Sequence, residues 1–311
     1  MAIPPEPEVP ATPLGDMVRA FVERSAITVP EAVVEIQRAK AVSRALPSTV
    51  ISPALLEHNL ARRGIWHTEP DRRQAEFHFA TEDTTGSLVI DYSLGQLSVA
   101  DMRLVAWLLG RWRDDEPEIS FSLRRCAAEL GVSWKGARAK GLRDQLRRIK
   151  GTLFTARVYN AKTKRHEEKL FSIVDEVTFR DFRDRFDGEA QGTTVSVRVG
   201  AFVADNIRSR HYSRLDLGRL RSLRSDCAQR LYAYLESQKG FQRGGADVVY
   251  EISVDERLQA TLGSSERLRR FRGRLAAAGE EICAADPRYL EISLRPGRAR
   301  YSWVLSMRRR A

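Results

Sequence analysis

The sequence of 311 residues is poor in cysteine. It has three, Cys126, Cys227 and Cys283, and their spacing fits neither a metal site nor a disulfide framework. Each lies in a predicted helix, where a cysteine usually packs as a small apolar side chain. We therefore expect a protein without disulfides that works in the cytoplasm.

Long apolar runs and a secretory leader are also missing. No stretch of about 18 apolar residues occurs, so we expect no transmembrane helix and no membrane partner. Residues 1–13 contain five prolines and two glutamates, and they lack the basic start of a signal peptide. Their composition predicts disorder instead.

Residue sets for catalysis are scarce. The five histidines include no two at metal-ligand spacing. The phosphate-binding pattern G-x-x-x-x-G-K-[ST] is absent, which argues against nucleotide hydrolysis. We expect no catalytic residues, no metal and no cofactor. An enzyme that nicks or transfers DNA strands is the alternative from another class, but its histidine pair and acidic triad are missing.

What the sequence has in excess is positive charge, and it is unevenly placed. The net charge is +11, made of −4 on residues 1–95 and +15 on residues 96–311. Of the 52 basic residues 44 are arginines, whose planar guanidinium binds phosphates and guanine edges through two parallel hydrogen bonds. This distribution predicts a polyanionic partner, with nucleic acid favoured over an acidic membrane.

Hydrophobic periodicity predicts one series of elements twice: a helix, a short strand, two helices joined by a tight turn, and a two-stranded hairpin. The two turns contain Gly131 and Gly263, each directly after a leucine. The series is that of a winged helix, which is a helix-turn-helix followed by a β-hairpin. The predicted ranges are 98–113, 119–121, 123–130, 133–150, 153–159 and 170–178 for the first copy, and 217–239, 250–252, 254–262, 264–284, 289–294 and 301–307 for the second.

We therefore predict an α+β fold with tandem winged-helix domains at residues 71–182 and 192–311. An N-terminal extension, residues 1–70, precedes them, partly disordered and with short helices at 14–25 and 30–46. The polar stretch 181–192 is the expected linker, and residues 195–199 form the first strand after it. Alternating apolar residues between 77 and 92, with Gly86 among them, predict another hairpin.

The second copy supplies the strongest DNA-binding candidates. Ser264 or Ser265 is the expected N-cap of the second helix. Helical spacing places Arg267, Arg270 and Arg274 on one outward face of this helix, and Arg269 lies beside them. The tip of the following hairpin adds Arg295, Arg298 and Arg300. The alternatives are a solvated basic helix face and a plain turn. Only Glu266 offers a counter-charge near this helix, which favours DNA.

The first copy has a weaker set of candidates. Ser133 is the expected N-cap, and Lys135, Arg138, Arg143 and Arg147 are expected to point outward. Gly136 and Gly141 weaken this helix by about 1 kcal/mol each relative to alanine. We therefore expect the second copy to make the main base contacts. Phosphate contact and a subunit interface are equal candidates for the first.

The hairpin of the first copy is more apolar than a wing needs, which predicts a self-association surface. The residues concerned are Leu153, Phe154, Val158, Leu170, Phe171, Ile173 and Val177. Alternation along a strand places one set of them on an outer face, and an uncovered strand edge pairs readily with another copy. The alternative is that helices near residues 33–42 cover this face within the chain.

Two stretches, SVADMRLVAWLLGRW at 98–112 and YSRLDLGRLRSLRSDCAQRLYAYLES at 212–237, resemble plasmid replication initiators of the Rep type. This family binds repeated origin sites called iterons. Its pattern LxSxxAxRLYxxL is matched by Leu223, Ser225, Ala228, Arg230, Leu231, Tyr232 and Leu235. The resemblance covers about residues 74–307. It implies double-stranded DNA as partner, a second winged domain that makes most base contacts, and a first that binds the other end of the site or pairs in a homodimer.

The resemblance further implies recruitment of host replication proteins such as a helicase, with no catalysis by the chain itself. A transcriptional repressor or a partition-site binding protein is the alternative within the DNA-binding class. Two motifs in one chain favour a long asymmetric site over a palindrome.

Overall fold

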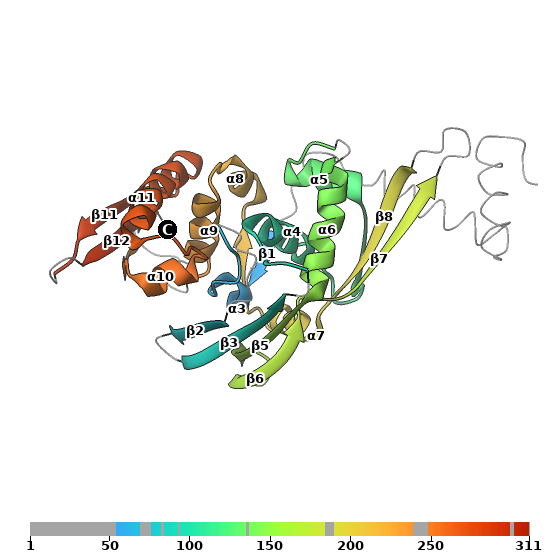
Figure 1. Ribbon diagram of the computed structural model, residues 1–311, viewed down its shortest axis with the longest axis horizontal. Coiled ribbons are helices and arrows are strands. Elements are labelled where there is room, and N and C mark those ends of the chain that lie inside the picture. The colour runs from blue at the N-terminus through green and yellow to red at the C-terminus, as the bar shows by residue number, and fades with distance from the viewer. Residues whose placement is uncertain are drawn as a thin grey trace, which may run out of the picture.

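The computed structural model describes residues 54–68, 76–81, 84–92, 94–134, 137–183, 190–238, 248–298 and 302–310. The predictions for residues 1–13, 14–25 and 30–46 lie outside these ranges, as do those for Lys135 and Arg300. Figure 1 shows two groups of helices and strands, in green and yellow at one end and in orange and red at the other, with blue elements between them. No helix among the described residues is long and apolar enough to cross a membrane.

The first group starts with helix α4 (Val99–Leu109), and the predicted capping box fixes its N-terminus. The Ser98 hydroxyl accepts the Asp101 backbone N–H, and the Asp101 carboxylate accepts the Ser98 N–H at 2.8 Å. The next elements are β4 (Glu118–Ser122), α5 (Leu123–Leu130) and α6 (Ala137–Gly151). Gly131 ends α5 with a φ of 69°, which favours glycine. Helix α6 is described from Ala137 onward, and the two residues directly before it lie outside the described ranges, so Ser133 as its N-cap stays a prediction.

A three-stranded antiparallel sheet of order β4-β8-β7 completes this first motif. Its other strands are β7 (Val174–Arg183) and β8 (Ala190–Val199). In β8, Val195 pairs with Phe121 and Val197 with Ile119, and both valines are fully buried. The expected linker is therefore part of the first motif, because its two ends lie in β7 and β8. The strand predicted to open the second domain, 195–199, belongs to this sheet as well.

A second hairpin is inserted between α6 and β7. It consists of β5 (Thr152–Asn160) and β6 (Arg165–Ser172), and with β2 (Glu76–Thr81) and β3 (Thr84–Tyr92) it forms a sheet of order β2-β3-β5-β6. The predicted hairpin at 77–92 is present, but Gly86 lies inside β3 opposite Phe79. The strand predicted at 170–178 is divided between two sheets at the fully buried Ile173. Strand β6 is an edge, on which Leu170 is 65% exposed.

The second motif follows α7 (Ala201–Arg208) and β9 (Tyr212–Leu215). The single helix predicted at 217–239 is in fact two, α8 (Leu217–Ser222) and α9 (Asp226–Glu236). The break occurs because the Ser225 hydroxyl accepts the Ala228 N–H at 3.1 Å and begins a new helix. The remaining elements are β10 (Val248–Ser253), α10 (Glu256–Thr261), α11 (Leu268–Ala285), β11 (Tyr289–Pro296) and β12 (Trp303–Arg309).

The sheet of the second motif has the order β10-β12-β11. In both motifs the last strand in the chain, β8 or β12, lies at the centre of the sheet. The first strand pairs with one side of it and the second strand with the other. Each sheet accompanies a helix-turn-helix, α5–α6 in one and α10–α11 in the other. The structure thus contains two tandem winged-helix motifs, as the sequence predicts.

Residues 54–68, here called the bridging segment, lie between the two motifs (Figure 1). They contain β1 (Ala54–Glu57), which pairs antiparallel with β9, and α3 (His58–Ala61). The sequence predicts that they belong to the N-terminal extension, yet Leu56, Leu60 and Trp66 are fully buried. Burial contributes about 1.5–3 kcal/mol for each such side chain. These residues are therefore part of the core, which continues from one motif into the other.

Candidate nucleic-acid interface

Three arginines surround the start of α11 and point into solvent. Arg267 is the N-cap residue, and Arg269 and Arg270 follow it in the first turn. The Arg270 side chain is 81% exposed, and its Nε lies 3.6 Å from the carboxylate of Glu266. Phe271 and Leu275 are fully buried and fix the opposite face of the helix against the core. Because a helix N-terminus carries about half a positive charge, the three cations reinforce a potential that attracts anions.

The start of α11 differs from the prediction in one detail. The helix begins at Leu268, so neither Ser264 nor Ser265 is its N-cap. Ser264 is buried in the turn, where its hydroxyl donates to the Glu266 carboxylate at 3.3 Å, and Ser265 is exposed. Ser265 therefore lies on the surface beside the three arginines.

Arg274 does not share their position. Its side chain is only 32% exposed, and its Nε lies 3.1 Å from an oxygen of the Glu266 carboxylate, which is itself buried. Its Nη2 donates to Thr68 Oγ1 at 3.2 Å. The sequence predicts that Arg274 points outward on the same face as Arg267 and Arg270. In the structure its side chain instead joins α11 to the preceding turn and to the bridging segment.

The arginines of the second hairpin fall into separate environments. Arg295 in β11 is ion-paired with Glu251 of β10, and Arg298 is exposed beyond the end of β11. The C-terminal Arg308 and Arg310 are exposed. Arg309 between them is buried, with its Nη2 3.3 Å from Glu236 and its guanidinium over the Tyr289 ring. Arg309 therefore holds β12 against α9 instead of facing a ligand.

The basic side chains of α6 are partly occupied by their own motif. Arg143 donates to Thr193 Oγ1 of β8 at 2.6 Å, and its guanidinium lies 5.4 Å from the ring centroid of Phe179 in β7. Arg147 is more exposed and is ion-paired with Asp144 at 3.1 Å. The prediction that both point outward fits Arg147 better than Arg143. The side chain of Arg138 lies outside the described residues.

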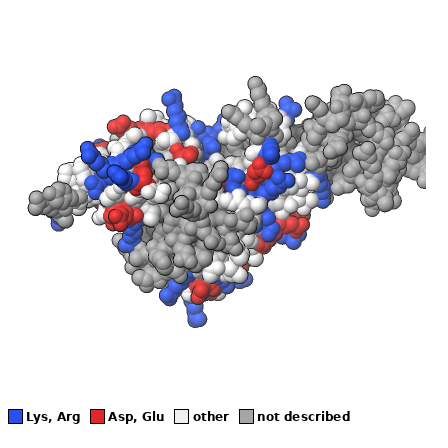
Figure 2. Space-filling model, viewed as in Figure 1, with Lys and Arg blue, Asp and Glu red and all other residues white. Residues whose placement is uncertain are grey.

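Other exposed groups extend the surface of the first motif. Lys140, Arg147 and Lys150 are exposed along α6, and Ser133 and the partly exposed Trp134 lie in the turn before it. Figure 2 shows Lys and Arg side chains in two groups on one face of the molecule, over the second motif on the left and near α6 on the right. Positive charge is thus present at both motifs.

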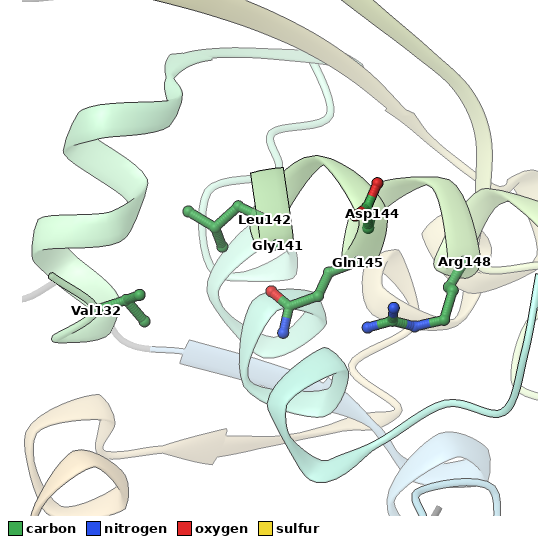
Figure 3. Close-up of a pocket in the computed structure, with 6 residues that line it drawn as sticks. All are labelled: Val132, Gly141, Leu142, Asp144, Gln145 and Arg148. Carbon is green, nitrogen blue, oxygen red and sulfur yellow. The ribbon is translucent and has the colours of Figure 1, made fainter. Parts of the chain in front are cut away.

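One hollow of about 260 Å³ opens beside α6 (Figure 3). Its lining residues are Val132, Gly141, Leu142, Asp144, Gln145 and Arg148. Arg148 donates to Asp101 at 2.9 Å, and Asp144 is paired with Arg147. Neither a histidine nor a cysteine lines this hollow. Within the described ranges, no cluster of His, Cys, Asp and Glu has the makings of a metal site.

No protein-family model and no curated protein sequence matches this chain. Solved structures do. A crystal structure of domains 2 and 3 of RctB aligns with a TM-score of 0.56 and 14% identity, over 81% of this chain and 98% of that one. A second crystal structure of RctB domains 2–3 aligns with a TM-score of 0.52 and 13% identity, over 79% of this chain and 95% of that one. The structure of the Pi initiator protein in complex with iteron DNA aligns with a TM-score of 0.48 and 14% identity, over 71% of this chain and 97% of that one. The chain therefore has the fold of RctB domains 2 and 3.

One residue of the initiator pattern has a role that the sequence did not reveal. Arg230 in α9 is completely buried, and burial lowers the pKa of its guanidinium to about 9. It donates to the carbonyl oxygens of Ala61, Arg63 and Thr261 at 2.7, 2.8 and 2.8 Å. The match of Arg230 to the LxSxxAxRLYxxL pattern was the signal in the sequence that could have pointed to this residue. The arginine fastens the bridging segment to the second motif.

A buried carboxyl group was missed as well. Glu57 accepts hydrogen bonds from the side-chain amides of Asn59 and Asn206 at 2.8 and 3.1 Å and from the Leu60 N–H at 3.0 Å. Complete burial nevertheless raises its pKa to about 7. The His211 Nε2 lies 3.8 Å away. No local pattern marks this cluster, because β1, α3, α7 and the segment before β9 bring it together.

Proposed function

We propose that this protein binds specific sequences of double-stranded DNA through both winged-helix motifs. The observation that carries the proposal is the exposed trio Arg267, Arg269 and Arg270 at the start of the second helix of a helix-turn-helix. In such motifs the N-terminal residues of that helix contact base edges in the major groove. Arginine is suited to guanine O6 and N7 there, and the wing arginines Arg295 and Arg298 to phosphates.

We further propose that the chain acts as a replication initiator of a plasmid or secondary replicon and binds repeated origin sites. Two motifs on one chain require a long asymmetric site, which direct repeats provide. The match of residues 223–235 to the initiator pattern supports this choice over a repressor or a partition-site protein. Direct repeats of about two helical turns beside the gene would favour the initiator. A single palindrome there would favour the alternative.

In this proposal the protein is not an enzyme, and it works in the cytoplasm with host replication proteins such as a helicase. The DNA is opened and copied by those partners. A pull-down of a purified replicative helicase by the full chain on origin DNA tests this part. Nicking of supercoiled origin DNA by the protein alone would contradict it.

The central test is selection of a bound sequence from a random duplex pool, followed by a salt titration on that sequence. If the two motifs and their wings neutralise about six to ten phosphates, affinity falls about 10³- to 10⁵-fold between 50 and 200 mM salt. No enriched sequence, or a flat salt profile, would refute the proposed two-motif interface.

A homodimer formed through β6 is the proposed self-association mode. The strand is an edge of its sheet, and Leu170 and Leu153 are 65% and 40% exposed beside it. Self-association cannot be tested with a chain that starts at Gln74 and so omits the N-terminal extension, because that chain also lacks the bridging segment, which is part of the core. Sedimentation of the full chain with Leu170→Glu is the better experiment, and we expect a monomer that still binds DNA. Val249→Glu is the matched control, since Val249 is 61% exposed on β10, an edge of the other sheet.

A further inference from the structure

The bridging segment contacts both motifs through consecutive peptide groups. The His67 N–H donates to the carbonyl oxygen of Leu97 at 2.9 Å, and His67 forms a bridge with Ser98, the N-cap of α4. The next N–H, that of Thr68, donates to the carbonyl oxygen of Gly263 at 3.0 Å. Successive Cα atoms are about 3.8 Å apart. The start of the first motif and the turn of the second helix-turn-helix are therefore fastened to adjacent points.

Further contacts strengthen the attachment to the second motif. Thr68 Oγ1 donates to the Gly263 carbonyl at 3.2 Å and accepts from Arg274 of α11. Arg230 binds two carbonyls of the bridging segment together with that of Thr261, at the end of α10. The segment thus contacts the turn between α10 and α11 and also α11 itself.

The attachment to the first motif is made at a second place. The Asn59 side chain exchanges two hydrogen bonds with the backbone of Tyr159 in β5, at 3.0 and 3.3 Å. Strand β5 continues directly from α6. Ile65 and Trp66, between the two anchoring regions, are fully buried. Both helix-turn-helix units are therefore held by one short, packed stretch of chain.

We propose that the bridging segment fixes the separation and rotation of α6 and α11, and so sets the number of base pairs between the two halves of the DNA site. This inference rests on the proposed function. One added base pair moves a half-site by about 3.4 Å along the axis and turns it by about 35°. A rigid pair of motifs cannot follow that change. Residues 54–68 are then positioning residues, which act on specificity without contacting DNA.

The two turn glycines provide a matched pair of variants. Gly131 and Gly263 have φ values of 69° and 70°, so alanine strains the backbone equally at both. A Cβ on Gly263 would lie 2.1 Å from the carbonyl oxygen of Trp66, which belongs to the bridging segment. The atoms nearest to a Cβ on Gly131 belong to the side chain of Arg221, with Nε at 2.7 Å, and that side chain can move. Gly263→Ala therefore displaces the segment, whereas Gly131→Ala leaves it in place.

The experiment measures binding of the full chain to the selected site and to versions with one or two base pairs added or removed between its halves. We expect the wild type and Gly131→Ala to lose about tenfold or more in affinity per base pair of change. Gly263→Ala is expected to lose less than about threefold, while its affinity for each isolated half-site stays that of Gly131→Ala. Thr68→Val, a smaller change that removes two of the anchoring hydrogen bonds, is expected to give the same flattening if Gly263→Ala does not fold.

A second readout needs no DNA and separates this inference from the proposed function. Spin labels on the exposed positions Lys140 of α6 and Ala277 of α11, in a Cys283→Ser background, report the distance between the motifs. We expect a narrow distribution in the wild type and a broad one in Gly263→Ala and Thr68→Val. Equal distributions and equal spacing profiles in all variants would overturn the inference. Absence of sequence-specific binding by the wild type would instead overturn the proposed function, and the distances would still decide whether the segment fixes the two helices.

Discussion

The two winged-helix motifs share a plan but use their basic side chains differently. Their sheets have the same strand order. Gly141 and Gly273 occupy equivalent positions in the two helices, because they are as far apart in the chain as the turn glycines Gly131 and Gly263. In the second motif the hairpin follows the helix directly, and three arginines stay in solvent. In the first a hairpin is inserted, and Arg143 packs on the motif's own strands. Packing, more than the number of arginines, therefore distinguishes the two surfaces.

The glycines do not explain that difference. The sequence predicts that the first motif is the weaker partner because of Gly136 and Gly141, yet α11 carries Gly273 at the position equivalent to Gly141. A Cβ on either Gly141 or Gly273 would have no neighbour within 4 Å. The expected inequality depends instead on where the arginine side chains lie.

The largest expected effect comes from removing the exposed charges of one motif at a time. Arg267, Arg269 and Arg270 replaced together by alanine should lower affinity for the selected site about a hundredfold or more, since each arginine on a base edge is worth about 1–3 kcal/mol. The matched triple is Lys140, Arg147 and Lys150, whose replacement should cost about tenfold on any sequence. Binding titrations on specific and unrelated duplexes compare them. Equal effects of the two triples would make the motifs equivalent.

The next effect concerns the buried Glu57 of β1, in the bridging segment. The folded-state pKa of Glu57 is about 7 against an ordinary value of 4.5. The folded protein therefore holds an extra proton between these values, and stability falls as pH rises through this window, by about 3 kcal/mol. Glu57→Gln removes the titration. The free energy of unfolding in urea, measured from pH 4.5 to 8, should fall for the wild type relative to this variant.

Two histidines, His58 and His211, lie beside Glu57. They remain in both proteins, so the difference between the two pH profiles isolates the carboxyl group. Parallel profiles would show that folding does not shift the pKa of Glu57.

A single substitution in each motif should separate base contact from phosphate contact. Arg270→Ala should cost about 1–3 kcal/mol on the selected site and relax the preference at one base pair. In the first motif the change is Arg147→Ala, because the side chain of Arg138 lies outside the described residues. It should weaken all sequences alike and reduce the salt slope by about one. Affinities on matched and singly mismatched sites decide. Loss of discrimination from Arg147→Ala would reverse the roles.

The smallest effect tests the likeness of the two helices. Gly141→Ala and Gly273→Ala each place a methyl group in open space on a helix, so each should raise the free energy of unfolding by about 0.5–1 kcal/mol. Thermal and urea unfolding measure this. A destabilised variant would indicate that its glycine has a structural role that the other lacks.

Local signals in the sequence predicted the helices and the repeat well. The Ser98 capping box, the apolar spacing in α4 and the Leu-Gly turns depend on neighbours a few residues apart, and all are present. Alternation also located the strand at 195–199, but a period of two does not reveal which sheet a strand joins. That choice depends on Val195 and Val197 meeting β4, which lies much earlier in the chain. The expected linker was wrong for this reason.

The candidate site was predicted in part. Helical spacing placed Arg267 and Arg270 outward, and both are exposed. It also placed Arg274 and Arg143 outward, because spacing alone does not show that Thr68 or Thr193 lies within hydrogen-bonding reach. The bridging segment carried no local signal, since a strand and a helix of four residues each are too short for periodicity. Its contacts with Gly263 span 195 residues.

The same separation has a consequence for how the chain is made. Ribosomes add about 5–20 residues per second, so Gly263 is synthesised about 10–40 s after Thr68. During that time Leu97, which follows His67 closely in the chain, is already available, whereas α9 with Arg230 and the turn at Gly263 are not. The bridging segment can therefore settle on the first motif during translation. The second motif then completes its fold against a surface that is already in place.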